Sequence, residues 1–284
     1  MDTLENMKKA IDYIEDNLTD NIKYSKIAQT ALCSQYHFQR IFVFLIGMPL
    51  SEYIRRRRLT LAALDLQNTN EKVIDVAIKY GYSSADAFSR AFQAMHGVTP
   101  SQAKKKDVSL KIQPRVTFSL SLKGVLEMNY RIVEKEAFSI VGIKERFSYL
   151  DDLGKSVGMM WSNISEETIK KISSLANVEP IGLVGAYSEM YDDDTTDYYI
   201  GAITTSDCPD GLVKLDIPVQ TWAIFEITGA MPLAMKDMWG RIFSEFFPTT
   251  GYEHAQAPEI EWYSNGDMSD PTYKSEIWIP IIKK

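Results

Sequence analysis

The first hundred residues place apolar side chains at the three- and four-residue spacing of amphipathic helices. Near the N-terminus, Ile11, Ile14 and Leu18 follow this spacing among charged neighbours, which predicts a helix there. Serines that can cap a helix start and glycines that can end one divide the following residues into further short helices. The pattern therefore predicts an all-helical N-terminal domain over residues 1–106.

One helix-turn-helix pattern occurs twice in this domain, about fifty residues apart. Residues 28–42 read AQTALCSQYHFQRIF, and residues 77–92 read AIKYGYSSADAFSRAF. Each copy has a short helix, a turn, a serine in N-cap position, and a second helix in which an arginine is followed two residues later by phenylalanine. Residues 50–68 predict one longer helix between the copies. Two such units on one rigid helix can enter successive major grooves, about 34 Å apart, so the doubled pattern indicates DNA binding.

The second part of the chain reads as strands that alternate with helices, and it contains another internal repeat. When its two halves are aligned, Tyr187 matches Tyr263, and Tyr198 falls opposite Glu276. We therefore expect an α+β domain over residues 128–284, built as a pseudo-twofold repeat with an antiparallel sheet and a cleft between the halves.

Charge divides the chain at the same place. The protein has a net charge of −7, but residues 1–106 carry fifteen Lys and Arg against eleven Asp and Glu, a net of +4. The remainder carries sixteen against twenty-seven, a net of −11. A mildly basic module joined to an acidic one fits a nucleic-acid reader tethered to a domain that does not contact nucleic acid. Between them, residues 107–127 form a polar, β-prone connector that either pairs weakly as strands or simply spans.

Other kinds of site are not indicated. Cys33 and Cys208 have no CxxC partner and no nearby histidine pair, so neither a disulfide framework nor a zinc site is expected. The run Asp192-Asp193-Asp194 favours a solvated hairpin tip over a metal site, and no cofactor is expected. Charged residues interrupt every apolar stretch before it reaches the length of a membrane span, and the N-terminal helix is not a signal peptide. We expect a soluble, cytoplasmic protein.

The helical domain resembles the DNA-binding domain of the AraC/XylS family over about residues 5–105. The resemblance is carried by Gly47, the run from Arg55 to Leu59, Ala77, Gly81-Tyr82, Phe88 to Phe92, and Gly97 to Ser101. In that family the exposed face of each second helix reads base edges, and Rob-like members place a sensor domain after the reader. Carried over by position, the first reader comprises Gln35, Tyr36, Gln39 and Arg40, and the second comprises Ser84, Ala85, Asp86, Ser89 and Arg90.

The two readers are chemically unequal. Gln39 can bind adenine through two hydrogen bonds and Arg40 can do the same to guanine, whereas Tyr36 can contact a thymine methyl group or a phosphate. The second reader has Arg90 as its one strong donor, so we expect it to contribute positioning and weaker specificity. The alternative is that Arg40 and Arg90 make internal ion pairs or hydrogen bonds.

Arginines 55 to 58 form a separate basic run on the long helix. Their side chains fan over a full turn, so they cannot all face one DNA backbone. We expect one or two of them to contact phosphate while the others pair with Glu52 or Asp65.

The acidic domain is similar to the GyrI-like effector-binding domain of Rob-type and BmrR-type regulators. The similarity is carried by the ending YKSEIWIPI, the preceding helix with Trp239, and the strand with Tyr263. It implies a pocket lined by aromatic residues between the two repeats, with an acidic residue on the last strand that faces lipophilic cations. By position this acidic residue is Glu276.

Strand alternation gives an independent argument for Glu276. It places Glu276 and Trp278 on one face of the last strand and the isoleucines 277, 279 and 281 on the other. If the isoleucines face the helices, Glu276 and Trp278 face the cleft, where a desolvated carboxylate with aromatic walls would attract a cation. The alternative for several wall residues, Trp161 and Trp239 among them, is a place in the core. The predicted lining is Trp161, Tyr187, Tyr198, Trp222, Tyr263, Glu276 and Trp278, with Met159 or Met160 beside them.

Three hypotheses follow. The first is a ligand-responsive transcription regulator, an activator and not an enzyme, which binds double-stranded promoter DNA as a monomer and contacts RNA polymerase. Its effector is a small molecule that is lipophilic or cationic. The second is a hydrolase that uses Glu276 with Tyr187 or Tyr263 as acid and base. The third is a domain that sequesters drugs, for which DNA contact is incidental.

Overall fold

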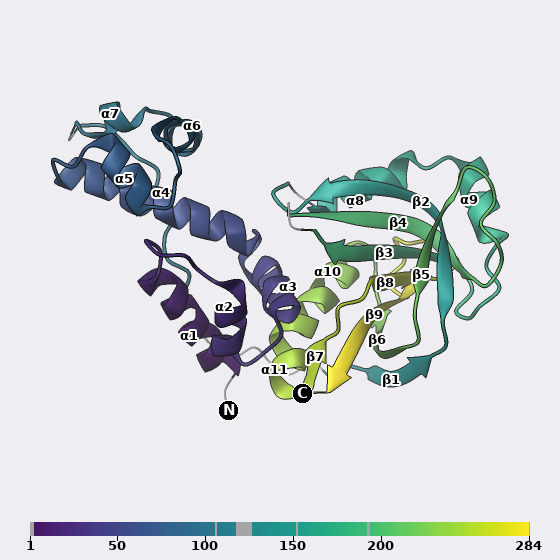
Figure 1. Ribbon diagram of the computed structural model, residues 1–284. Helices are drawn as coiled ribbons and strands as arrows, with labels where there is room; N and C mark the ends of the chain where they lie inside the picture. The colour runs from purple at the N-terminus through teal and green to yellow at the C-terminus, as the bar shows by residue number, and fades with distance from the viewer. Residues whose placement is uncertain (1–2, 106, 118–126, 152, 192–193, 284) are drawn as a thin grey trace. The chain divides into compact units, whose positions relative to one another are not determined.

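Two units, residues 1–121 and 122–284, make up the computed structural model of the protein (Figure 1). The structure describes residues 3–105, 107–117, 127–151, 153–191 and 194–283. The first unit is helical and the second combines helices with an antiparallel sheet, which confirms the predicted fold class. Among the described residues, no helix is both long enough and apolar enough to cross a bilayer.

Capping residues set the ends of the helices in the first unit. The Ser34 hydroxyl accepts a hydrogen bond from the His37 backbone N–H at the start of one reading helix, and Ser84 accepts from Ala87 at the other. Gly47 ends the first of these helices at a positive φ of 75°, which a residue with a side chain rarely adopts. The helices are α1 (Thr3–Asp16), α2 (Tyr24–Ala31), α3 (Gln35–Ile46), α4 (Leu50–Asn68), α5 (Val73–Lys79), α6 (Ala85–His96) and α7 (Pro100–Ala103).

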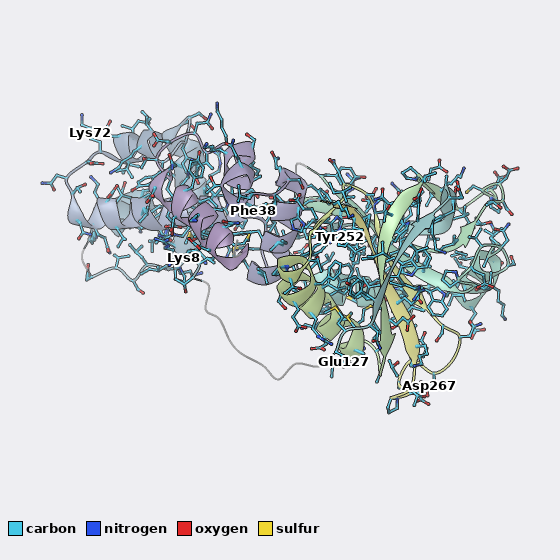
Figure 2. All side chains as sticks on the ribbon, turned by 90° about the horizontal axis from the view of Figure 1, so that it is seen from below. Lys8, Phe38, Lys72, Glu127, Tyr252 and Asp267 are labelled. Carbon is cyan, nitrogen blue, oxygen red and sulfur yellow. The ribbon has the colours of Figure 1, made fainter. Side chains whose placement is uncertain are left out.

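The long helix α4 connects two small cores. Phe42 lies in the first core, with its ring centroid 5.4 Å from that of Tyr53 on α4. Phe38 is buried beside Phe42, with ring centroids 6.0 Å apart. Lys72 is exposed and lies at the edge of the molecule (Figure 2). The second core packs Leu59 and Ala63 of α4 against Phe92 of α6. The structure therefore contains the predicted pair of helix-turn-helix units on one connecting helix.

The predicted connector does not simply span. Its first part, residues 107–117, is extended and lies against α4, where the Gln113 backbone N–H donates to the Thr60 hydroxyl. Residues 118–126, the rest of the segment expected to pair or span, lie outside the described residues, as does Lys106 at the predicted boundary. The start of the predicted connector thus belongs to the first unit.

The second unit is built on one antiparallel sheet with the strand order β1-β6-β9-β8-β3-β4-β2-β5, and β7 pairs with β9. The strands are β1 (Tyr130–Lys135), β2 (Phe138–Ser148), β3 (Leu183–Met190), β4 (Thr195–Thr204), β5 (Val213–Ile217), β6 (Gln220–Thr228), β7 (Tyr252–His254), β8 (Glu259–Tyr263) and β9 (Lys274–Lys283). The helices are α8 (Leu153–Asn163), α9 (Glu166–Ser173), α10 (Leu233–Arg241), the π-helix η1 (Ile242–Phe246) and α11 (Phe247–Thr249). Along the chain, α8 and α9 follow β2, and α10, η1 and α11 follow β6.

The strand order contains the predicted repeat. It is symmetric about the ladder between β3 and β8, so β2, β3 and β4 of the first half correspond to β6, β8 and β9 of the second. The outer strands are exchanged, because β1, which precedes the first half, pairs with β6 of the second, and β5 pairs with β2.

The predicted match of Tyr198 to Glu276 is wrong. Tyr198 pairs with Tyr187, and Ser275 pairs with Tyr263. If Tyr187 corresponds to Tyr263, as the repeat predicts, then Tyr198 corresponds to Ser275. The one-residue difference moves the predicted partner to the opposite face of its strand.

Candidate functional site

The N-terminal half of α3 exposes the four residues predicted for the first reader. Gln35 is exposed, and Tyr36, Gln39 and Arg40 are partly exposed. Phe38, on the opposite side of the helix, is buried in the core. The spacing of the four residues keeps them on one side of the helix, so they form a continuous polar face.

A similar face is present on α6. Asp86 and Arg90 are exposed and Ser89 is partly exposed, whereas Phe88 and Phe92 are buried. The predicted second reader is completed by the exposed cap Ser84 and the partly exposed Ala85. Asp86 lies in the first turn of the helix, where the positive end of the helix dipole favours a carboxylate. The position therefore has a structural use that does not require a base contact.

The basic run on α4 is largely engaged inside the unit. Arg55 and Arg56 both donate to the buried carboxylate of Glu52, and Arg57 pairs with Glu15 at 2.6 Å. The expected pairing with Glu52 is therefore confirmed for two of the arginines, and their side chains remain 43% and 44% exposed.

The expected pairing of an arginine with Asp65 is wrong. Asp65 instead accepts from Lys79 and from the Tyr80 hydroxyl, both at 2.8 Å. Arg58 donates to the backbone carbonyls of Leu18 and Asp20, at 2.7 Å each, and so holds the end of the first helical segment.

In the second unit, a buried carboxylate lies at the centre of a ring of aromatic side chains. Glu261 of β8 accepts hydrogen bonds from the Trp239 indole N–H at 2.7 Å and from the hydroxyls of Tyr263 and Tyr198 at 3.0 and 3.1 Å. The Trp161 indole N–H donates to the Tyr198 hydroxyl at 2.9 Å. We call these five residues the Glu261 cluster. Among the described residues, Glu261 has no ion pair with a lysine, arginine or histidine.

Further rings close the Glu261 cluster. Tyr187 lies 4.6 Å from Tyr198 and 6.4 Å from Trp239 between ring centroids. Trp161 meets Tyr263 edge to face at 5.1 Å. Met160 packs against Tyr198 and also lines a surface hollow of 330 Å³ between β2 and α8. A flexible methionine side chain therefore contacts both the hollow and a tyrosine of the cluster.

A glycine makes room for this arrangement. Gly185 of β3 lies directly opposite Glu261 of β8 in the central ladder. A Cβ atom at Gly185 would lie 1.9 Å from the Tyr198 hydroxyl oxygen, so any side chain there would displace that hydroxyl from the carboxylate. The sequence thus combines a glycine on one strand with a glutamate on the other at the centre of the repeat.

Burial governs the electrostatics of the Glu261 cluster. Burial raises the pKa of Glu261, and the three hydrogen bonds that it accepts act in the opposite direction. The nearby carboxylate of Glu259, which is itself bound to His254 at 2.6 Å, raises this pKa further. Burial also raises the pKa values of Tyr198 and Tyr263 well above their usual range, so both remain neutral hydrogen-bond donors.

The prediction that Glu276, Trp278 and Trp222 share a wall with the tyrosines is wrong. Glu276 pairs across the sheet with Trp262, one residue away from Glu261, and therefore lies on the other face. There it binds Arg131 at 2.7 Å and accepts from the Trp278 indole N–H. Trp278 and Trp222 lie in the core on that face and are 1% and 0% exposed.

The predicted lining was wrong because the cleft was assigned to the face of the sheet opposite the helices. Ile277 does lie on the face with the helices, since it pairs with Glu261, but the Glu261 cluster is on that same face. Trp161, Tyr187, Tyr198 and Tyr263 of the predicted lining come together there. Sequence reasoning missed Glu261 and left Trp239 out of the predicted lining. The signal was present in EIEWY, because Glu261 precedes Tyr263 by two residues and so shares its face.

Comparison with known proteins agrees with this division. Residues 128–282, more than half of the chain, match the family model of a GyrI-like small molecule binding domain. Residues 27–106 match a helix-turn-helix domain of the AraC type. The sheet unit resembles the structure of SAV2435 bound to tetraphenylphosphonium, with a TM-score of 0.50, 21% identity, and coverage of 55% of this chain and 94% of that one.

The helical unit resembles bacterial regulators. It is 43% identical over 108 residues to the HTH-type transcriptional activator AarP of Providencia stuartii, which covers 37% of this chain and 80% of AarP. It is 33% identical over 96 residues to the regulatory protein SoxS of Salmonella typhimurium, which covers 34% of this chain and 90% of SoxS.

Proposed function

The chain belongs to the family of GyrI-like small-molecule-binding domains and carries an AraC-type helix-turn-helix domain before it, and from this premise we propose that it is a one-component transcription activator. The helical unit reads promoter DNA, and a ligand of the sheet unit controls that binding or the transcription that follows. The observation that carries the proposal is the presence, in one chain, of two exposed reading faces and a buried carboxylate without a cationic partner among the described residues.

The first reading helix supplies most of the base recognition in this proposal. Replacing Arg40 by Ala should weaken binding to a selected DNA duplex by about tenfold or more, since a bidentate contact to guanine contributes about 1–3 kcal/mol of discrimination. Arg90→Ala should cost less and should weaken all sequences more evenly. Footprinting and fluorescence anisotropy on a duplex selected from a random pool would measure both effects. Equal retention of the selected and a scrambled duplex by the wild-type chain would contradict the proposal.

One chain suffices on DNA, because it carries both reading helices. Sedimentation of the protein with a short selected duplex should give a complex of one chain per duplex at every protein concentration up to saturation. Two chains per duplex at the lowest occupancy would contradict the proposal that the protein binds DNA as a monomer. As an activator the bound chain would act beside RNA polymerase, in the cytoplasm where the chromosome lies, and transcription with purified polymerase tests this contact directly.

We propose a lipophilic cation as the ligand class of the sheet unit. Glu261 supplies a desolvated negative charge, and the surrounding rings supply apolar surface and cation–π attraction. The hydrogen bonds within the Glu261 cluster would have to open around such a ligand. Tetraphenylphosphonium, to which the similar protein SAV2435 is bound, is a suitable probe. Met160, a flexible side chain, packs against Tyr198 and also lines the 330 Å³ hollow.

Binding without turnover is our preferred role for this unit. The acid–base pair expected for a hydrolase, Glu276 with Tyr187 or Tyr263, is not formed, because Glu276 lies on the other face of the sheet. Glu261 does contact two tyrosines, but both hydroxyls donate to it, and their raised pKa values keep them protonated, so they are weak acids and supply no phenolate to act as a base. Hydrolysis of an electrophilic ligand that disappears in Glu261→Gln would favour the enzyme.

A further inference from the structure

An extended segment runs along α4 from one helix-turn-helix unit to the other. We call residues 108–116 the strap. At one end the Val108 carbonyl accepts from Gln67 near the C-terminus of α4, and at the other end the Val116 N–H donates to Tyr53 near its N-terminus. The fourteen residue steps from Tyr53 to Gln67 rise roughly 21 Å along the helix, and the eight steps from Val108 to Val116 span up to roughly 26 Å when extended. The strap therefore follows α4 over most of its length, in the antiparallel direction.

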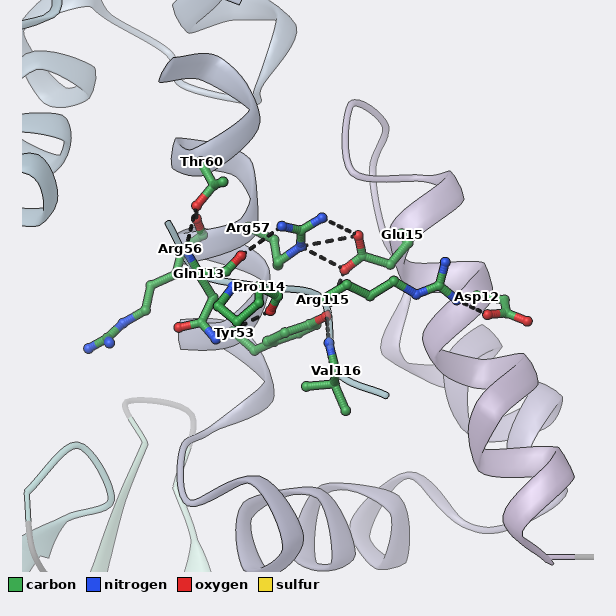
Figure 3. Close-up of polar contacts among 10 residues, drawn as sticks. All are labelled: Asp12, Glu15, Tyr53, Arg56, Arg57, Thr60, Gln113, Pro114, Arg115 and Val116. Carbon is green, nitrogen blue, oxygen red and sulfur yellow. Dashed lines mark hydrogen bonds and ion pairs between the residues drawn. The ribbon is translucent and has the colours of Figure 1, made fainter. Parts of the chain in front are cut away.

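The C-terminal end of the strap is hydrogen-bonded to α4 and ion-paired with α1. The Tyr53 hydroxyl accepts from the Val116 N–H at 3.1 Å and donates to Glu15 of α1 at 2.7 Å (Figure 3). Arg115 forms an ion pair with Asp12, also on α1. One phenol thus connects the strap, α4 and α1 through two hydrogen bonds.

The middle of the strap is held by side chains of α4. The Gln113 N–H donates to the Thr60 hydroxyl at 3.0 Å, and the Gln113 carbonyl accepts from Arg57 at 2.7 Å (Figure 3). Toward its N-terminal end, Leu110 packs against the core of the second helix-turn-helix unit. The strap therefore contacts α4 and both helix-turn-helix units, although it contains no helix or strand of its own.

We propose that the strap fixes the separation and rotation of the two reading helices, so that Tyr53 and Thr60 are positioning residues that determine which operator spacing the protein accepts. This inference rests on the proposed DNA-binding function. A helix alone can bend and fray, and a second chain segment bound at both ends and in the middle restricts that motion. Specificity for spacing then comes from residues that touch no base.

The test compares two versions of one duplex, selected by the wild-type full-length chain from a random pool. The second version carries one additional base pair between the two footprinted segments, which rotates them by about 35° relative to each other. The measured quantity is the ratio of the two dissociation constants. The variant Tyr53→Phe/Thr60→Val removes both hydroxyls while it keeps the shape of the buried side chains.

We expect this variant, which removes two hydrogen bonds to the strap, to lower the spacing ratio by at least about fivefold, the change in an equilibrium that a single lost hydrogen bond produces. The backbone amides of Gln113 and Val116 should exchange their hydrogens faster in the variant. The matched control is Tyr80→Phe/Thr69→Val, which removes two hydroxyls bonded to Asp65 and leaves the strap untouched. The control should keep the wild-type ratio.

Three results would overturn the inference. The ratio could stay unchanged although the strap amides exchange faster, the control could relax the ratio equally, or the two amides could remain protected in the variant. Failure of the proposed function looks different, because the wild-type chain would then select no duplex at all.

Discussion

Replacing Glu261 by Gln is expected to weaken binding of tetraphenylphosphonium by at least about thirtyfold. Loss of a buried charge that pairs with a ligand costs about 2 kcal/mol or more, and the amide keeps the size of the side chain. The control is Glu276→Gln, which should leave the affinity within about twofold, because Glu276 lies on the opposite face of the sheet and pairs there with Arg131. Isothermal titration of both variants and of the wild-type chain measures the difference.

The opposite result would place the ligand site at Glu276, as the sequence analysis predicted. If Glu276→Gln lost the affinity and Glu261→Gln kept it, the cation would bind on the other face, beside Trp278. Circular dichroism of each variant in the absence of ligand would show whether its fold is intact.

The pH dependence provides a second readout of the Glu261 prediction. Burial raises the pKa of Glu261, so its carboxylate becomes protonated at a higher pH than an exposed glutamate, and affinity for the cation should fall as pH falls through that raised value. The stability of the ligand-free fold should show the opposite slope. A raised pKa gives stability that is fully present below the unfolded-state pKa and is lost as pH rises through the folded-state value. In Glu261→Gln both slopes should disappear.

Replacing Arg57 by Ala is expected to destabilise the helical unit by about 3–5 kcal/mol. The side chains of Arg57 and Glu15 are only 11% and 8% exposed, so the variant leaves a nearly buried carboxylate without its cation. The strap also loses the donor to its Gln113 carbonyl. Urea unfolding of the full chain, followed by helical circular dichroism, measures the loss.

Arg56→Ala is the matched comparison for Arg57→Ala. Arg56 is the neighbouring arginine, its side chain is 44% exposed, and Glu52 keeps Arg55 as a partner in its absence. We expect a change of about 1 kcal/mol or less. Similar losses in both variants would show that burial of the Arg57–Glu15 pair does not set its importance.

The helical unit could be predicted closely because its signals are local. Ser34, Ser84 and Gly47 mark helix ends through contacts within a few residues, and the three- and four-residue spacing of apolar side chains separates Phe38 and Phe92 from the predicted reading faces. The strap was missed for the opposite reason. Its bonds join residues far apart in sequence, such as Gln113 to Thr60, and nothing in a polar, extended segment indicates which surface it will contact.

The proposed ligand site illustrates a different limit. Sequence alternation correctly separated Glu276 from Ile277, whose partners across the sheet, Trp262 and Glu261, lie on opposite faces. The face that bears the cluster, however, depends on where the helices pack and on strand register, and a slip of one residue exchanges the faces. Gly185 allows the Glu261 cluster to form on this face, since only a residue without a side chain leaves space for the Tyr198 hydroxyl.

The exchange of outer strands between the halves has a consequence for synthesis of the protein. During translation β1 is made before the other strands, and its partner β6 follows about ninety residues later. One edge of β3 likewise stays unpaired until β8 has been made. The reading helices, in contrast, precede every strand. The DNA-binding unit is therefore synthesised before Glu261. A nascent or prematurely ended chain would contain the reading helices but lack the carboxylate proposed to bind the effector.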